Sequence, residues 1–137
     1  MSVRSFFDTN VLVYVEDHGS PAKQVRARDT LERTRRAGET VLSTQVLQEY
    51  FVTVTRKLRV SPQIARTKVQ ILARCDVVRT DVEDIVAAID LHHLHGLAFW
   101  DALIVRCAIR GGCSVLYTED LQPGRRFDGV EVVNPFA

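Results

Sequence analysis

Residues 3–13 read Val-Arg-Ser-Phe-Phe-Asp-Thr-Asn-Val-Leu-Val, and this stretch decides how the chain folds. The apolar run up to Phe7 predicts a buried strand that ends at Asp8. Thr9 and Asn10 are residue types that favour turns and helix N-caps, so a helix should begin there. In open parallel α/β sheets, ligands bind beyond the carboxyl ends of the strands. Asp8 is therefore the first candidate functional residue, although an acid in this position can also serve only as a helix cap.

Strands and helices alternate along the rest of the chain. This alternation predicts an α/β protein with a parallel sheet and helices on both faces. Thr80 to Glu83 has the spacing of a capping box, and residues 124–129 are expected to form a polar loop. The expected strands are residues 3–7, 40–43, 76–79, 113–117 and 130–133, and the expected helices are residues 9–15, 21–37, 44–58, 62–74, 80–95 and 98–110.

The composition is that of a globular protein, and we expect one domain over residues 1–137. Hydrophobic residues make up 46% and charged residues 26% of the chain, which are ordinary values. No apolar run approaches the ~18 residues of a membrane span, and the N-terminal stretch lacks the apolar region of a signal peptide. Cys75, Cys107 and Cys113 are odd in number and have no C-x-x-C spacing. They are expected to be buried thiols in a reducing cytoplasm, away from membranes.

The net charge of +1 hides an asymmetry between the two halves of the chain. Residues 1–74 carry thirteen Lys and Arg against seven Asp and Glu, whereas residues 75–137 carry five against ten. Fifteen of the 18 basic residues are Arg, which suits planar, bidentate phosphate contacts. Arg26, Arg33 and Arg36 on helix 21–37 are candidates for such contacts, although a solvated helix face explains each cluster equally well.

Three further acids belong near the same edge of the sheet as Asp8. Asp120 follows the fourth strand, so its carboxylate approaches Asp8 if the first and fourth strands are neighbours. Glu49 lies near the start of helix 44–58, at the same edge. Asp101 falls on the apolar side of helix 98–110, where a buried carboxylate is costly unless it is paired, hydrogen-bonded or bound to a metal. It also lies in the first turn, where the helix dipole alone can account for an acid.

Four converging acids need a cation between them. Carboxylates brought together repel and raise each other's pKa unless a positive charge intervenes. Oxygen ligands without paired His or Cys suit Mg²⁺ or Mn²⁺ and argue against zinc. Such a site commonly clamps a phosphate and lowers the pKa of an attacking water.

With these residues the chain resembles the PIN-domain ribonucleases, specifically the VapC-type toxins of type II toxin–antitoxin pairs. The resemblance implies a three-layer α/β/α fold with a five-stranded parallel sheet in the order 3-2-1-4-5. It also implies Mg²⁺-dependent endonucleolytic hydrolysis of single-stranded RNA, a cognate antitoxin and a homodimer. The matching segments are Asp8-Thr9-Asn10-Val11-Leu12-Val13-Tyr14, Gln48-Glu49-Tyr50-Phe51, Phe99-Trp100-Asp101-Ala102-Leu103-Ile104, Tyr117-Thr118-Glu119-Asp120-Leu121-Gln122 and Val133-Asn134-Pro135-Phe136.

The resemblance also implies roles for particular residues. On matching positions the acidic quartet is Asp8, Glu49, Asp101 and Asp120, and the polar supports are Asn10 and Thr118. Glu119 stands beside Asp120, and the family's Thr-x-Asp spacing selects Asp120 as the ligand. In the implied mechanism the carboxylates hold the metal, and Glu49 helps to deprotonate a water that attacks the phosphodiester in line.

Two other classes of protein remain as alternatives. A receiver domain of a two-component system also binds Mg²⁺ on acids at strand ends, but it needs an Asp that ends the third strand and a Lys after the fifth. Here Asp76 begins the third strand and no Lys follows residue 68. In a non-catalytic RNA-binding module, Asp101 on an apolar face is a needless liability. The histidines before Gly96 suit the C-terminal end of a helix better than a metal site.

Overall fold

A computed structural model, which describes residues 3–137, has a six-stranded sheet in the order β3-β2-β1-β4-β6-β5. Five strands pair in parallel, and β5 pairs with β6 in the antiparallel sense. The parallel sheet and the neighbouring positions of β1 and β4 confirm the prediction. The strands are β1 (Ser5–Phe7), β2 (Thr40–Ser43), β3 (Asp76–Val78), β4 (Val115–Tyr117), β5 (Arg126–Phe127) and β6 (Val130–Val133).

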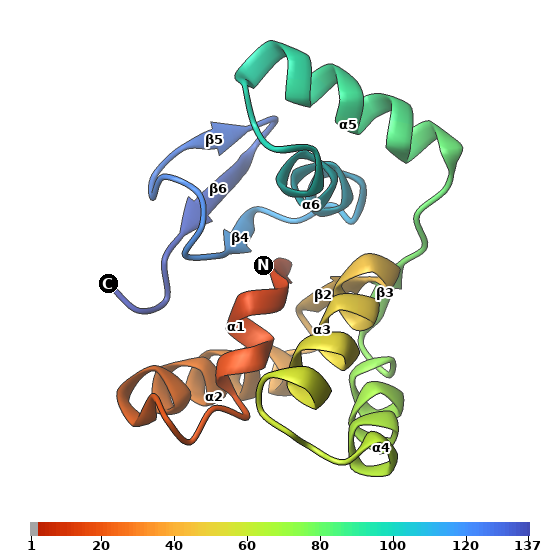
Figure 1. Cartoon of the computed structure of the whole chain (residues 1–137). Coiled ribbons are helices and arrows are strands. Elements are labelled where there is room, and N and C mark those ends of the chain that lie inside the picture. The colour runs from red at the N-terminus through yellow and green to blue at the C-terminus, as the bar shows by residue number, and fades with distance from the viewer. Residues whose placement is uncertain (1–2) are drawn as a thin grey trace.

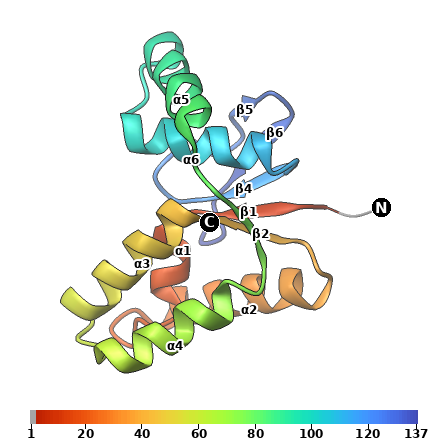
Figure 2. The same ribbon diagram turned by 90° about the vertical axis from the view of Figure 1, so that its right-hand side faces the viewer.

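Helices cover both faces of this sheet and form the predicted three layers (Figure 1). On one face α6 packs against the strands and α5 lies outside α6, while the other four helices cover the opposite face (Figure 2). None of the helices in the described part of the chain is long and apolar enough to cross a membrane. The helices are α1 (Thr9–Tyr14), α2 (Pro21–Arg36), α3 (Thr44–Arg56), α4 (Pro62–Leu72), α5 (Val82–His95) and α6 (Phe99–Arg110).

The predicted number of strands was wrong by one, because residues 124–129 are not all loop. Arg126 pairs with Glu131 and Phe127 with Val130, which leaves a hairpin loop of two residues. Those residues, Asp128 and Gly129, both have positive φ angles, of 45° and 84°. Asp-Gly with two positive φ angles is typical of a type I′ turn, whose twist matches that of the flanking strands.

Several helices begin and end at the small residues that the sequence predicts as caps. Ser43 accepts a hydrogen bond from the backbone N–H of Val46, and Ser61 accepts one from Ile64. Gly96 ends α5 in the left-handed conformation. The capping box of α5, however, is formed by Asp81 and Asp84 and not by Thr80 and Glu83. The box starts one residue later than predicted, and Thr80 is instead hydrogen-bonded to Thr44.

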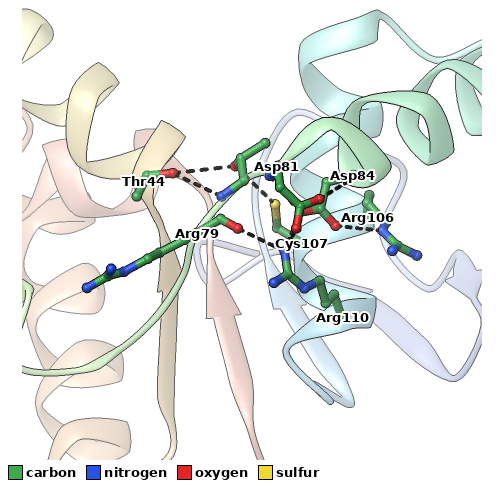
Figure 3. A network of polar contacts seen from close by, with 8 residues as sticks. Thr44, Arg79, Asp81, Asp84, Arg106, Cys107 and Arg110 are labelled. Atoms are coloured by element: carbon green, nitrogen blue, oxygen red, sulfur yellow. Dashed lines mark hydrogen bonds and ion pairs between the residues drawn. The ribbon is translucent and has the colours of Figure 1, made fainter.

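A buried carboxylate fastens α5 to α6 (Figure 3). Asp84 has 0% of its surface exposed, and its carboxylate closes the capping box by accepting a hydrogen bond from the backbone of Asp81. Arg106 Nε donates to the same carboxylate at 3.0 Å, and Arg110 also contacts it. Arg110 donates in addition to the backbone oxygen of Arg79. We call Asp84, Arg106 and Arg110 the α5–α6 clamp.

The core fills the space on both sides of the central strands. Phe6, Phe7, Leu42, Leu116 and Val132 come from neighbouring strands and have at most 1% of their surface exposed. Apolar side chains on both faces of a strand are what a sheet covered by helices on both sides requires. All three cysteines are free; Cys107 and Cys113 are buried as predicted, and Cys75 is partly exposed.

Candidate functional site

Three carboxylates meet at the carboxyl ends of β1 and β4. Asp8 directly follows β1, Asp120 follows β4, and Asp101 lies in the first turn of α6. One carboxylate oxygen from each residue lies within 4.8 Å of the others. The parallel pairing of β1 with β4 brings the first two together. We call these three residues the acidic cluster.

Asp8 is the most buried member of the cluster, with 6% of its surface exposed. One carboxylate oxygen accepts a hydrogen bond from the backbone N–H of Thr9 at 2.7 Å, so Asp8 does cap α1. The other oxygen accepts one from the Thr118 hydroxyl at 2.8 Å. The pKa of Asp8 is raised to about 7, mainly by burial and to a smaller extent by the charges of Asp120 and Asp101, against the lowering effect of the two hydrogen bonds. Capping is thus only part of its environment.

Thr118 links two members of the cluster. Its hydroxyl donates to Asp8 and accepts a hydrogen bond from the backbone N–H of Asp120 at 3.1 Å. The side chain is fully buried, so water does not compete for these bonds. This geometry is that of a residue which orients both acids.

Asn10, the other predicted polar support, lines the same cleft as the cluster. Both polar atoms of its side chain are buried and have no hydrogen-bond partner among the described residues. A buried amide without partners is unfavourable, so its presence beside three acids favours a site that a ligand completes.

The position of Asp101 on the helical wheel predicts full burial, but its side chain is only half-buried. The first turn of α6 opens onto the cleft, whereas residues 102–105 pack into the core. Burial raises the pKa of Asp101, and the nearby charges of Asp120 and Glu49 raise it further. No side chain caps α6, whose N-cap residue is Ala98. A hydrogen-bonded helix cap therefore does not account for Asp101.

Glu49 lies on the α3 wall of the cleft, outside the group of three. Its carboxylate accepts a hydrogen bond from the Thr9 hydroxyl at 2.6 Å and one from the Gln45 amide at 3.4 Å. Because Thr9 belongs to α1 and follows Asp8, this bond fixes the fourth acid relative to the other three.

Glu119 points to a cation of the chain itself. Its carboxylate accepts hydrogen bonds from the Tyr14 hydroxyl at 2.9 Å and from Lys23 Nζ at 2.8 Å. Lys23 also lies 4.7 Å from the centre of the Tyr14 ring. Of the two adjacent acids, Asp120 belongs to the cluster and Glu119 is held by Lys23. The sequence gives no signal for this pairing, since Lys23 lies 96 residues away from Glu119.

The cleft around the cluster has a volume of about 650 Å³ and is strongly acidic. Lys57 is the one basic residue among the described residues that line it, and it is not one of the site residues predicted from the sequence. Close oxygen donors without His or Cys are the ligands that Mg²⁺ and Mn²⁺ prefer. The donor set therefore fits a hard divalent cation. The acids that line the cleft are Asp8, Asp17, Glu49, Asp101, Glu119 and Asp120.

The three candidate arginines lie on α2 and do not line the cleft. Arg26 donates to the backbone oxygen of Ala137, Arg33 donates to the Tyr117 hydroxyl, and Arg36 forms an exposed ion pair with Glu32. Any contact that they make with a polyanion therefore lies outside the cleft.

Among residues 3–137, neither a receiver-like site at the end of the third strand nor a histidine metal site is formed. Asp76 begins β3 and pairs with Arg4 at 2.7 Å, so it does not end the third strand as in a receiver domain. His92 bonds to the backbone oxygen of Leu97, and the ring of His95 packs against Phe127. Within residues 3–137 the acidic cluster is the one group with metal-binding geometry.

The sequence of the chain also matches a known protein family. The family model described as PIN domain matches residues 5–128. No curated protein matches the chain in sequence.

Several solved structures share the fold at low sequence identity. A toxin–antitoxin complex from Klebsiella pneumoniae superposes with a TM-score of 0.70 at 19% identity, covering 96% of this chain and 97% of that chain. VapC20 from Mycobacterium tuberculosis, described as a toxin that cleaves the sarcin–ricin loop, superposes with a TM-score of 0.67 at 17% identity, covering 85% of this chain and 91% of that chain. VapBC2 from Rickettsia felis, bound to a promoter DNA fragment, superposes with a TM-score of 0.67 at 18% identity, covering 95% of this chain and 97% of that chain.

Proposed function

Since the chain belongs to the PIN domain family, we propose that it is a metal-dependent endoribonuclease that cleaves phosphodiester bonds of single-stranded RNA. The observation that carries the proposal is the acidic cluster, whose three carboxylates lie close together and form no ion pair with a Lys or Arg of the described residues. Such a group is unfavourable by itself and becomes favourable around a divalent cation.

Asp8, Asp101 and Asp120 are proposed to hold Mg²⁺ or Mn²⁺, and Thr118 keeps two of them in position. When bound, the ion supplies charge stabilisation at the phosphate and lowers the pKa of a water in the cleft. Glu49, oriented by Thr9, lines the same cleft from α3 and is proposed to accept the proton of the attacking water. The free amide of Asn10 is proposed to bind and orient the phosphate or that water.

We further propose that the protein is the toxin of a type II toxin–antitoxin pair. This proposal is supported by the fold that the chain shares with the toxin–antitoxin complex from K. pneumoniae, the toxin VapC20 from M. tuberculosis and VapBC2 from R. felis. A cognate antitoxin, a homodimer and a cytoplasmic location belong to the same proposal.

The decisive experiment is to incubate the purified protein with mixed cellular RNA in Mg²⁺, in Mn²⁺ and in excess chelator, and to map the cut ends. Cleavage should need the divalent ion and should return when it is restored. Asp101→Asn should be inactive, while Asp90→Asn, on the exposed side of α5, should cleave normally. Full activity in chelator would rule out the metal mechanism, and binding without cleavage under every condition would indicate an RNA-binding module.

The arginines on α2 are proposed to contact the RNA backbone outside the cleft. Replacing Arg26 and Arg33 with Ala should weaken RNA binding and lower the salt dependence, because each lost phosphate contact removes roughly 0.7 units of log–log slope on single strands. Lys57→Ala, inside the cleft, serves as the comparison. An unchanged slope in the double variant would assign these arginines to solvated surface.

A further inference from the structure

One large aromatic side chain is exposed at the edge of the acidic cleft. Trp100 is the single tryptophan of the chain, and 62% of its surface is exposed although residues 102–105 of the same helix are buried. It directly precedes Asp101 and lines the same cleft. The Phe99 ring lies edge-on to the indole at 5.2 Å, which restrains the indole on one side. An exposed aromatic residue beside a polar site is informative because burial is the usual state of such a side chain.

Beside Trp100 lies a buried hydrogen-bond acceptor without a partner. Gln45 of α3 is 6% exposed, and its Nε2 donates to Glu49 and to the backbone oxygen of Trp100, each at 3.4 Å. Both neighbours are acceptors, which fixes the orientation of the amide. Its Oε1 is then buried without a partner among the described residues. Gln45 also lines the cleft, so a donor that enters the cleft can satisfy this oxygen.

We propose that Trp100 and Gln45 form a nucleotide subsite next to the acidic cluster. Trp100 stacks on an unpaired base of the RNA, and Gln45 Oε1 accepts a hydrogen bond from the same nucleotide. The proposal rests on the ribonuclease function and specifies its substrate: a strand that presents an unstacked base beside the phosphate to be cut.

The chemistry of nucleotides matches both groups. Every base has a flat π face, and stacking on an aromatic side chain is a common way to bind single strands. The ribose 2′-hydroxyl and the amino groups of bases are donors that an amide oxygen can accept. A base within a duplex is stacked on both sides and is unavailable to Trp100, so the subsite favours loops and single strands.

The fluorescence of Trp100 provides a direct test, because no other tryptophan contributes to the signal. The whole protein, with Ca²⁺ in place of Mg²⁺, is titrated with a short oligoadenylate and with an abasic oligonucleotide of equal length. Gel analysis checks that the oligonucleotides stay intact. We expect saturable quenching by the oligoadenylate and little change with the abasic strand. Equal quenching by both strands would overturn the proposal.

Steady-state cleavage in Mg²⁺ supplies the second measurement. Trp100→Ala should raise the KM for RNA by about 5- to 100-fold, because base stacking is lost. Trp100→Phe should keep KM within about threefold, since a phenyl ring still stacks. Gln45→Leu should also raise KM but leave the quenching at saturation intact. Leu94→Ala on α5 removes another exposed apolar side chain, with 74% of its surface exposed, away from the cleft and is the matched control.

The outcomes separate this proposal from the ribonuclease function. Quenching by bases without RNA cleavage in Mg²⁺ or Mn²⁺ supports the subsite and refutes the ribonuclease. A normal KM for a folded Trp100→Ala variant, with RNA cleavage intact, refutes the subsite alone. A variant with unchanged KM but altered sedimentation mass assigns Trp100 to a protein interface and also refutes the subsite.

Discussion

Helix α6 contributes to two charged groups, the acidic cluster and the α5–α6 clamp, and they differ in whether the carboxylates are paired with arginines. Asp101 in its first turn belongs to the acidic cluster, whose members form no ion pair with a Lys or Arg of the described residues. Arg106 and Arg110, near its other end, surround the buried carboxylate of Asp84 in the α5–α6 clamp (Figure 3). Each group contains a strongly buried acid, Asp8 in the first and Asp84 in the second.

The pKa values of these two buried acids move in opposite directions. Burial raises the pKa of both, and for Asp8 burial outweighs the hydrogen bonds from Thr118 and Thr9. For Asp84 the bonds from the Asp81 backbone and Arg106, with the charge of Arg110, outweigh burial and hold the pKa below its usual value. The charge of Asp84 is thus balanced within the chain, whereas the charges of the acidic cluster are not and favour a bound proton or cation.

The largest effect should appear in the pH dependence of stability without metal. The pKa of Asp8 is about 7 in the folded protein against an ordinary value of 3.8, so the folded state binds an extra proton between these two pH values. The free energy of unfolding should therefore fall as pH rises from about 4 to about 7, by about 4 kcal/mol at most. Denaturant melts in chelator at several pH values measure this fall.

Asp8→Asn is the matched variant for that measurement. It keeps the size of the side chain and cannot ionise, so its stability relative to the wild type should rise with pH over the same interval. Parallel pH profiles for the two proteins would show that Asp8 has an ordinary pKa and that the cluster is not strained.

The clamp should show the second-largest effect on stability. Ionisation of Asp84 should stabilise the folded protein, whereas ionisation of Asp8 should destabilise it. Asp84→Asn leaves Arg106 and Arg110 without their carboxylate, and breaking a buried ion pair typically costs 3–5 kcal/mol. Because both arginines are partly exposed, we expect a loss of about 3 kcal/mol at pH 7. The difference from wild type should shrink below about pH 4, as Asp84 of the wild type becomes protonated. A variant as stable as the wild type at pH 7 would contradict the stabilising role of the clamp.

Removing a charge from the acidic cluster should have the smallest effect on stability. Asp101→Asn should abolish cleavage yet raise the unfolding free energy of the metal-free protein by ~1 kcal/mol at low salt, because one like-charge repulsion is lost. Saturating Mg²⁺ should remove this advantage, since the ion stabilises the wild type preferentially. If Asp101 only serves the helix dipole, the same variant loses a few tenths to ~1 kcal/mol and still cleaves RNA.

The acidic cluster was predictable because its members lie at positions that local pattern defines. Asp8 and Asp120 follow apolar strands, and parallel strands end at one edge of a sheet. Asp101 stands out as an acid on an apolar helix. Its actual exposure was not predictable, because a helical wheel cannot show that the first turn of α6 opens onto a cleft.

The clamp and the Lys23–Glu119 pair were beyond prediction for a different reason. Asp84 meets Arg106 and Arg110 across 22 and 26 residues, and Lys23 meets Glu119 across 96. No periodicity links such positions, so only the packing of helices reveals them. The hairpin at Asp128 and Gly129 differs, because the sequence itself contains an Asp-Gly pair, which is a hairpin signal that the predicted loop did not take into account.

That hairpin has a consequence for how the protein avoids self-association through its sheet. The outer edge of a sheet offers unpaired backbone groups that can recruit strands from other molecules and start aggregation. Here β5 occupies the edge beside β6 with only two residues, one of them charged, and β3 at the other edge has three and begins with Asp76. Both edge strands are thus short and carry a charged residue, and β5 shields β6, with its buried valines, from neighbouring molecules.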